Sequence, residues 1–245
     1  MMRIQRFTLQ LTAAASLVMA AAAQTPAPPK DALLKGFPYQ DEALHYTINW
    51  PSGLSLGDST LSAHHTANGW DFEVSLDAAV PGFAIKDKYK SSATAALCSA
   101  ELSRDVSHGP KKTKEKTTFD QDKNTAHRVT EYPADGGNSD LSVPACARDA
   151  IAYVYFGRKE LGQGRVPGAQ QIFFGSAYNA KMEWTGAQTI KVGDKQEVTD
   201  HMVATVQGPK SNFTVEVFYA RDAARTPLAI KVPLTVGTLS LELVR

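Results

Sequence analysis

Histidine is the residue type in this sequence most suited to metal binding or to proton transfer near neutral pH. The chain has six histidines, and no two of them stand at the i, i+4 spacing that places metal ligands on one face of a helix. His64 and His65 are adjacent, so in a strand their rings would point to opposite faces. Because a metal site needs several convergent ligands, we expect none here. The histidines are His45, His64, His65, His108, His127 and His201.

Sequence signatures of catalysis are also missing. There is no Gly-x-Ser-x-Gly nucleophile elbow, no phosphate-binding loop and no dinucleotide fingerprint. The sequence therefore indicates no catalytic residue and no cofactor. Asp and Glu are abundant, so carboxylates could still converge in the folded chain.

The two cysteines, Cys98 and Cys146, predict a disulfide bond. In an exported protein an isolated pair is most simply a structural bridge. A redox motif would have two intervening residues, and this pair is much farther apart. Two separate buried thiols are the alternative. In the chain-entropy model a bridge over a loop of this size removes roughly 4 kcal/mol from the advantage of the unfolded state.

The first residues have the features of a secretory signal peptide, which we predict to span 1–23. Arg3 and Arg6 give it a basic start, and the apolar stretch Leu9–Ala23 ends in alanines. This stretch is short and Ala-rich for a membrane-spanning helix, which needs about 20 strongly apolar residues; an uncleaved anchor is the alternative. Residues 24–36 are Pro-rich and predict a linker. We therefore expect a periplasmic or secreted protein of a bacterial envelope.

The charge of the chain argues against nucleic acid as a partner. The formal net charge is +1, and it becomes −1 when the two arginines of the predicted signal peptide are removed. Binding of a phosphate backbone needs a basic stripe, which a nearly neutral surface does not supply. No later segment is long and apolar enough to cross a membrane, so we expect no transmembrane segment after signal removal.

Apolar and polar residues alternate over much of 37–245, for which we expect a single domain. The segment from Leu44 to Trp50 shows the pattern most clearly, and it is typical of a half-buried antiparallel strand. Turn signals such as Asn68-Gly69 separate such segments. We expect an irregular loop from Pro133 to Ser142. The pattern predicts a mainly β fold, all-β or β-rich α+β: a large curved antiparallel sheet or partly open barrel of about ten to twelve strands with one short helix.

One segment, Asp149 to Lys159, has helical spacing. Ile151, Val154 and Tyr155 would lie on one face of such a helix. Asp149 at its start and Arg158 near its end suit the helix dipole. We expect this helix to cover one face or end of the sheet through its apolar side chains.

A single short helix covers little of a large apolar sheet face. The sheet must therefore either fill its interior with side chains or leave a cavity. For any single aromatic residue, filling the core is at least as expected as lining a cavity. The aromatic residues that we take as candidates for a ligand cavity are Trp50, Trp70, Phe72, Phe173, Phe174 and Trp184.

Three signatures in the sequence resemble those of one bacterial protein family. In the helical segment an Asp is followed by two aromatic residues and an Arg, here Asp149, Tyr155, Phe156 and Arg158. The opening strand from Leu44 followed by Gly57 is a weaker match. The C-terminal signature consists of Asp222, Arg225, Pro227, Leu228, Gly237 and the final Glu242-Leu243.

Together these signatures resemble the domain of unknown function 3108 family over roughly Phe37 to Arg245. The resemblance implies an exported bacterial protein without an established activity, and it supplies no catalytic residue. A small residue, often Ser, is usual in the family where Ala152 stands, so a hydroxyl role at that position is excluded here. We interpret the signature residues as structural: Asp149, Tyr155, Arg158, Asp222, Arg225 and Pro227.

Two hypotheses of function remain. The first is a non-catalytic binding or structural module of the envelope, whose ligand is apolar or amphipathic (a lipid or an envelope polymer) or whose partner is an envelope protein. The alternative is a hydrolase or a metal-dependent enzyme acting on cell-envelope material. We favour the first because no catalytic motif is present. A deep apolar cavity in the fold would favour binding, whereas a cleft with convergent carboxylates and histidines would favour an enzyme.

Overall fold

The computed structural model describes residues 41–80, 83–209, 211–234 and 237–245. The predicted signal peptide, linker and cleavage site therefore lie outside the described residues. Within the described ranges the chain forms fifteen strands and one helix. They are β1 (Glu42–Asn49), β2 (Ser55–Thr66), β3 (Gly69–Val80), β4 (Phe83–Thr94), β5 (Ser99–His108), β6 (Lys111–Asp120), β7 (Thr125–Tyr132), β8 (Asn138–Ser142), β9 (Arg148–Asp149), α1 (Ala150–Gly162), β10 (Gln170–Phe173), β11 (Ala177–Val192), β12 (Lys195–Gln207), β13 (Asn212–Ala220), β14 (Pro227–Leu234) and β15 (Gly237–Leu243).

All fifteen strands belong to one sheet, in the order β8-β7-β6-β5-β4-β3-β2-β1-β15-β14-β13-β12-β11-β10-β9. Neighbours are antiparallel except β9 and β10, which are parallel. The pairing of β1 with β15 joins the two halves of the chain, with Tyr46 opposite Leu243. Strands β8 and β9 stand at the two ends of the order, so within the described residues the sheet is open.

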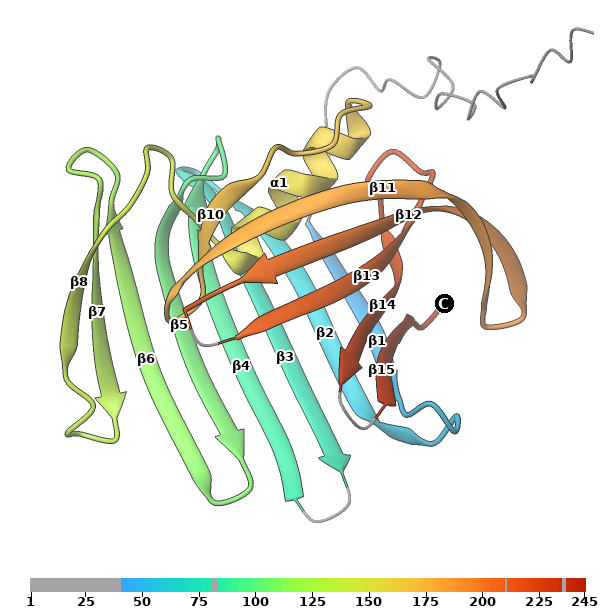
Figure 1. Ribbon diagram of the computed structural model, residues 1–245, viewed down its shortest axis with the longest axis horizontal. Helices are drawn as coiled ribbons and strands as arrows, with labels where there is room; N and C mark the ends of the chain where they lie inside the picture. The colour runs from blue at the N-terminus through green and yellow to red at the C-terminus, as the bar shows by residue number, and fades with distance from the viewer. Residues whose placement is uncertain (1–40, 81–82, 210, 235–236) are drawn as a thin grey trace, which may run out of the picture.

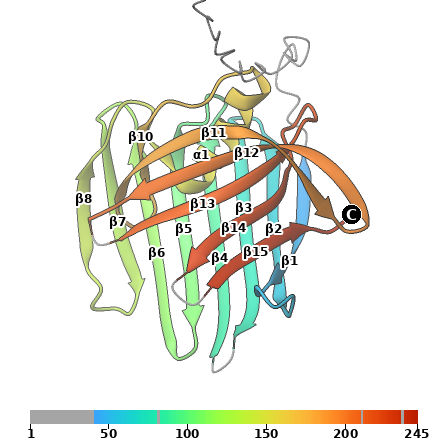
Figure 2. The same cartoon turned by 45° about the vertical axis from the view of Figure 1, so that its right-hand side comes forward.

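The sheet is strongly curved. Figure 1 shows β1 to β7 as an upright wall, with β11 to β13 arching across in front of it. Figure 2 confirms from a second side that the arch and the wall face each other, with α1 between them near one end. The predicted large, curved, partly open antiparallel sheet with one short helix is therefore confirmed.

The number of strands is higher than the ten to twelve predicted. Strand β8 is an exposed edge strand inside the segment expected to be an irregular loop, and that expectation is wrong for Asn138–Ser142. Edge strands need no apolar face, so they lack the alternation from which strands are predicted. Strand β9 has only two residues, too few for any periodic signal.

Helix α1 begins one residue later and ends three residues later than the predicted segment of Asp149 to Lys159. Asp149 is its N-cap. Ile151 and Tyr155 are buried and Val154 is half-buried. Tyr155 stacks on Phe72 of β3 with 4.1 Å between ring centroids, so the helix does pack on the sheet.

The predicted disulfide bond joins Cys98, which precedes β5, to Cys146, which precedes α1. The bridge spans 48 residues and ties the start of the helix to the β4–β5 connection. Thiol labelling of unfolded, unreduced protein is expected to detect no free thiol, and labelling after reduction is expected to detect two. Labelling of either cysteine before reduction would contradict this prediction.

Candidate functional site

Helix α1 covers only one end of the inner face, which we define as the face of the sheet on which the helix packs. Its 13 residues extend about 20 Å at the usual helical rise. The 12 residues of β3 extend about 40 Å. The helix contacts Phe72 near the start of β3, whereas Leu76 and Ala78 belong to a separate apolar cluster that contains no residue of α1.

The N-terminus of α1 is fixed to the sheet through Asp149. Its carboxylate accepts hydrogen bonds from the backbone N–H groups of Ile151 at 2.8 Å and Ala152 at 3.0 Å. The hydroxyls of Ser91 and Ser99 donate to its other oxygen, each at 2.6 Å. Burial raises the pKa of Asp149, and these hydrogen bonds oppose the rise. The cap thus joins the helix to β4 and β5.

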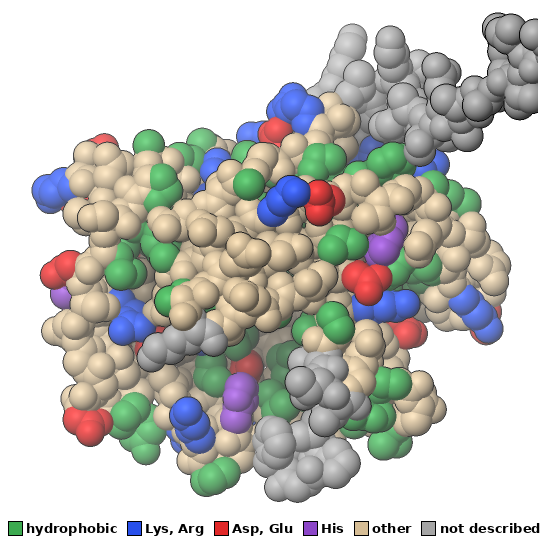
Figure 3. All heavy atoms as spheres, viewed as in Figure 1, with side chains coloured by type: hydrophobic (Ala, Val, Ile, Leu, Met, Phe, Trp, Pro, Cys, Tyr) green, Lys and Arg blue, Asp and Glu red, His purple; other side chains and the backbone are tan. Residues whose placement is uncertain are grey.

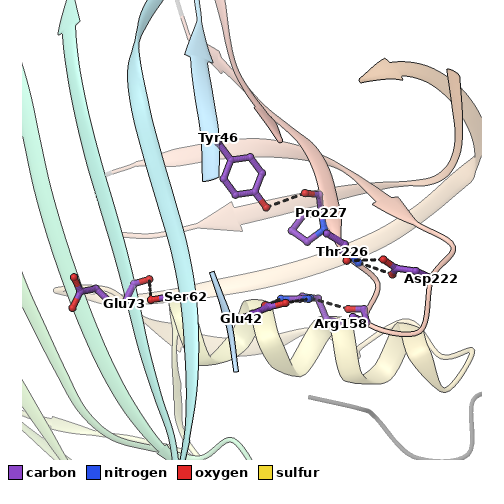
Figure 4. A network of polar contacts seen from close by, with 9 residues as sticks. Glu42, Tyr46, Ser62, Glu73, Arg158, Asp222, Thr226 and Pro227 are labelled. Carbon is purple, nitrogen blue, oxygen red and sulfur yellow. Dashed lines mark hydrogen bonds and ion pairs between the residues drawn. The ribbon is translucent and has the colours of Figure 1, made fainter. Parts of the chain in front are cut away.

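The last turns of α1 are fixed by Arg158, which is fully buried. Its guanidinium forms an ion pair with Glu42 of β1, with Nη2 donating to Oε2 at 3.0 Å. Its Nε donates to the carbonyl of Ala224 at 3.0 Å. In the same region, the hydroxyl of Tyr46 donates to the carbonyl of Pro227 at 2.9 Å (Figure 4). The helix is therefore held to both halves of the sheet.

The remaining signature residues shape the turn between β13 and β14. Asp222 accepts hydrogen bonds from the backbone N–H of Thr226 at 2.9 Å and from its hydroxyl at 2.6 Å. Arg225 donates to Asp200 of β12 at 2.8 Å. The structure thus places the residues that we interpreted as structural in the cap, the core and the turn around α1.

An apolar cluster lies on the sheet at the end away from α1. Ile48, Leu56 and Ala78 are its buried members. Ile85 of β4 lies opposite Ala78, so it faces the same side of the sheet. The apolar side chains that pack against the cluster while only partly buried are Trp50, Leu76, Ile85, Leu239 and Leu241. We call these eight residues the far-end cluster.

Polar side chains border the far-end cluster on β4 and β5. The hydroxyl of Tyr89 donates to Asp87 at 2.8 Å, and Nε2 of His108 lies 3.1 Å from the same carboxylate oxygen. Burial, and then the neighbouring Asp87 carboxylate, raise the pKa of Tyr89. The Asp87 side chain is only 8% exposed and that of His108 is 47% exposed, so this group of polar atoms reaches from the interior to the surface.

A second polar group continues across β5, β6 and β7. Arg104 donates to Glu115 at 2.8 Å, and Arg128 donates to the carbonyl of Gly175 at 2.6 Å. The Arg104 guanidinium also lies 4.5 Å from the centre of the Phe174 ring. The inner face therefore changes from apolar at the far-end cluster to charged along these strands. We call Asp87, Tyr89, Arg104, His108, Glu115 and Arg128 the polar belt.

The molecular surface is hollowed where the inner face opens. Figure 3 shows a recess beneath the arch of β11 to β13, in which hydrophobic and charged side chains are both visible. An amphipathic recess of this kind can hold an apolar chain against one wall and a polar group against the other.

The six candidate cavity aromatics are not brought together. Trp70, Phe72 and Phe173 are buried in the core beneath α1, where they fill space. Phe174 packs against that core and the Arg104 side chain. Trp50 belongs to the far-end cluster. Trp184 lines a separate pocket near the end of α1. Sequence reasoning missed the polar belt, because its residues converge only through the register of β4 to β7.

A pocket of about 830 Å³ lies over β1 to β5 on the side opposite the inner face. Most of its lining residues are polar or charged, among them Ser62, Glu73 and Lys90. Lys88 and Lys90 lie 2.9 and 3.5 Å from Glu73, and the hydrogen bond from Lys88 is the main cause that lowers the pKa of Glu73. Because its charges are paired locally, this surface offers less for a ligand than the inner face.

One hydroxyl–imidazole–carboxylate chain is present elsewhere. Thr185 Oγ1 lies 2.6 Å from His201 Nδ1, and His201 Nε2 lies 2.9 Å from Glu216. Thr185 Oγ1 also lies 3.2 Å from the carbonyl of His201, which offers its proton a second acceptor.

Within the described residues, no group of three His, Cys, Asp or Glu side chains could hold a metal ion. No helix there has the length and apolar character needed to cross a bilayer.

Comparisons with known proteins concern the family and the fold. The family model described as protein of unknown function (DUF3108) matches residues 45–244. Among solved structures, a β-barrel-like protein of domain of unknown function DUF1849 from Brucella abortus is similar, with a TM-score of 0.59 and 8% sequence identity. The alignment covers 84% of this chain and 96% of that one. At this identity the likeness shows the fold alone. A search of curated proteins found no match.

Proposed function

We propose, from the premise that the chain belongs to the DUF3108 family, that it is a non-catalytic binding protein for an amphipathic ligand with an acyl chain. The apolar chain of the ligand packs on the far-end cluster, and its polar end meets the polar belt. The predicted signal peptide supports a place in the bacterial envelope, where lipids supply ligands of this chemistry.

The observation that carries this proposal is the incomplete burial of the far-end cluster. Five of its eight apolar side chains are only partly buried, although they lie on the same face of the sheet as the core. A short helix at the other end of the strands cannot cover them. An apolar sheet face of which the described residues leave a part exposed is a common place for an apolar ligand.

Burial of these side chains supplies a favourable free energy of binding. Covering roughly 40 Å² of apolar surface on one side chain contributes about 1 kcal/mol. The five partly buried members of the cluster could therefore contribute several such increments, against the cost of immobilising a flexible chain. The polar belt supplies donors and acceptors for the other end, so the site favours an amphiphile over a hydrocarbon.

Titration with the fluorescent fatty acid 11-(dansylamino)undecanoic acid tests the proposal. Ile85 packs in the far-end cluster on the inner face, and Ala84 is exposed on the opposite face of the same strand. Ile85→Glu is expected to weaken binding at least tenfold, because it places a carboxylate against the acyl chain. Ala84→Glu carries the same charge on the other face and is expected to bind as wild type does.

Circular dichroism must show that both variants are folded. If Ile85→Glu does not fold, Ile85→Gln provides an uncharged replacement with the same expected direction. Absence of probe binding to wild type, or equal binding by folded variants with changes at 84 and 85, would contradict the proposal.

The alternative of a hydrolase has one observation in its favour, the contact chain of Thr185, His201 and Glu216. A hydroxyl, a base and an orienting carboxylate in series are the arrangement of a nucleophilic site. However, none of the three lines the pockets named here, and the hydroxyl has a carbonyl as a competing acceptor. Release of fatty acid from an acyl ester by wild type, lost in His201→Ala, would favour the hydrolase over the binding protein.

A further inference from the structure

A smaller pocket of about 210 Å³ lies beside the C-terminal end of α1, apart from the far-end cluster. Its apolar walls are Leu161 of the helix, Val166, Trp184 of β11 and Tyr219 of β13. Leu161 and Tyr219 pack in a cluster of buried apolar side chains that includes Met182 and Met202, so one side of the pocket is rigid. Trp184 is only partly buried, which leaves part of its indole ring available to a ligand.

The charges at this pocket do not balance. Asp200 lies 2.8 Å from both Arg221 and Arg225, so one carboxylate serves two guanidinium groups. Arg165, also in the lining, is paired with Glu160 at 2.7 Å. The Arg165–Glu160 pair is neutral, whereas the group of Arg221, Asp200 and Arg225 carries one excess positive charge. Asp200 and Arg225 of this group line the pocket, and Arg221 lies outside its lining.

Arg225 is the least satisfied of these arginines. It is 5% exposed, and among the described residues its guanidinium donates one hydrogen bond, from Nη1 to Asp200. Its Nε is buried without a partner. Its backbone has a φ of 48°, a region that non-glycine residues rarely adopt and that is held only by the surrounding structure. A buried guanidinium with unused donors is suited to a carboxylate, which can accept from two of its N–H groups.

We propose that this pocket binds a small carboxylate with an apolar body, such as an aromatic or short branched-chain acid. The body packs against Trp184, Leu161 and Tyr219, and the carboxylate meets the excess charge of the Arg221–Asp200–Arg225 group. The pocket is smaller than the usual site of a drug-sized ligand, which limits the ligand to a single ring or a short chain. This site is independent of the proposed amphiphile site.

Isothermal titration calorimetry of the intact protein with phenylacetate tests the proposal, with phenethyl alcohol and phenethylamine as neutral and cationic probes. Phenylacetate is expected to bind at least tenfold more tightly than either of them. Trp184→Ala is expected to weaken phenylacetate binding at least tenfold, because it removes the apolar wall. Arg225→Lys, which keeps the charge and loses the planar fork, is expected to reduce the preference for the acid.

Trp50→Ala is the matched control, because Trp50 is also a partly buried tryptophan and lies in the far-end cluster. It is expected to leave phenylacetate binding unchanged while weakening binding of the fatty acid probe. If Arg225→Lys does not fold, the proposal is tested by the affinities of the wild type for the three probes and by the affinity of Trp184→Ala for phenylacetate. No binding of phenylacetate, equal binding of the three probes, or unchanged binding by folded Trp184→Ala would overturn the proposal without affecting the amphiphile site.

Discussion

Replacement of Arg158 by methionine is expected to lower the free energy of unfolding by about 3–5 kcal/mol. Arg158 is fully buried and carries the ion pair that joins α1 to β1. Methionine keeps much of the side-chain volume but leaves Glu42, whose side chain is 18% exposed, without its countercharge. It also leaves the carbonyl of Ala224 without the Nε donor. Urea unfolding followed by circular dichroism measures the loss.

A surface ion pair provides the control for this prediction. Lys181 and Glu183 lie 2.7 Å apart, but both side chains are more than half exposed. Lys181→Met is therefore expected to change stability by less than about 1 kcal/mol. The double variant Glu42→Gln, Arg158→Met is expected to be more stable than Arg158→Met alone, because it removes the buried charge. Equal effects of Arg158→Met and Lys181→Met would show that the buried pair does not hold the helix.

Tyr155→Ala is expected to cost about 3–5 kcal/mol, the usual range for loss of a large buried aromatic side chain. Tyr155 is fully buried and its ring stacks on Phe72. The truncation would open a space between α1 and β3 that neither element can close, because both are fixed by Asp149 and Arg158. Thermal or urea unfolding gives the change in stability.

Tyr155→Phe distinguishes the contribution of the ring to stability from that of the hydroxyl. Because the ring and its stacking remain, this variant is expected to lose only about 1 kcal/mol, on the scale of one hydrogen bond. A melting midpoint unchanged in Tyr155→Ala would contradict the buried position of this side chain. Equal losses in both variants would assign the stabilisation to the hydroxyl instead of to packing.

Local patterns were enough to predict the helix, the β-rich class and the disulfide bond. Alternation identifies strands with one apolar face, such as β1, and i, i+4 spacing identifies the face of α1 that carries Ile151 and Tyr155. Strand β8 escaped prediction because Leu141 is its one apolar residue, which is too few for an alternating pattern. The pairing of β1 with β15 joins the two ends of the domain, and no local pattern contains that information.

The candidate site was less predictable than the fold. Arg158 and Glu42 are 116 residues apart, so the sequence shows one partner of the pair without the other. The polar belt depends on the register that sets Arg104 opposite Glu115, which a shift of one residue would destroy. The candidate aromatics were chosen by residue type alone, and three of them fill the core because type does not distinguish a core side chain from a cavity wall.

Photolabelling most directly tests whether the inner face is a ligand site. A fatty acid with a diazirine near the end of its acyl chain is bound to the intact protein, irradiated and located by peptide mass spectrometry. If the inner face is the ligand site, labels are expected on peptides that carry the far-end cluster, around Leu76 and Ile85 of β3 and β4 and around Leu239 and Leu241 of β15. Excess unlabelled fatty acid is expected to suppress these labels. Labels confined to other peptides, or labels that competition does not suppress, would contradict it.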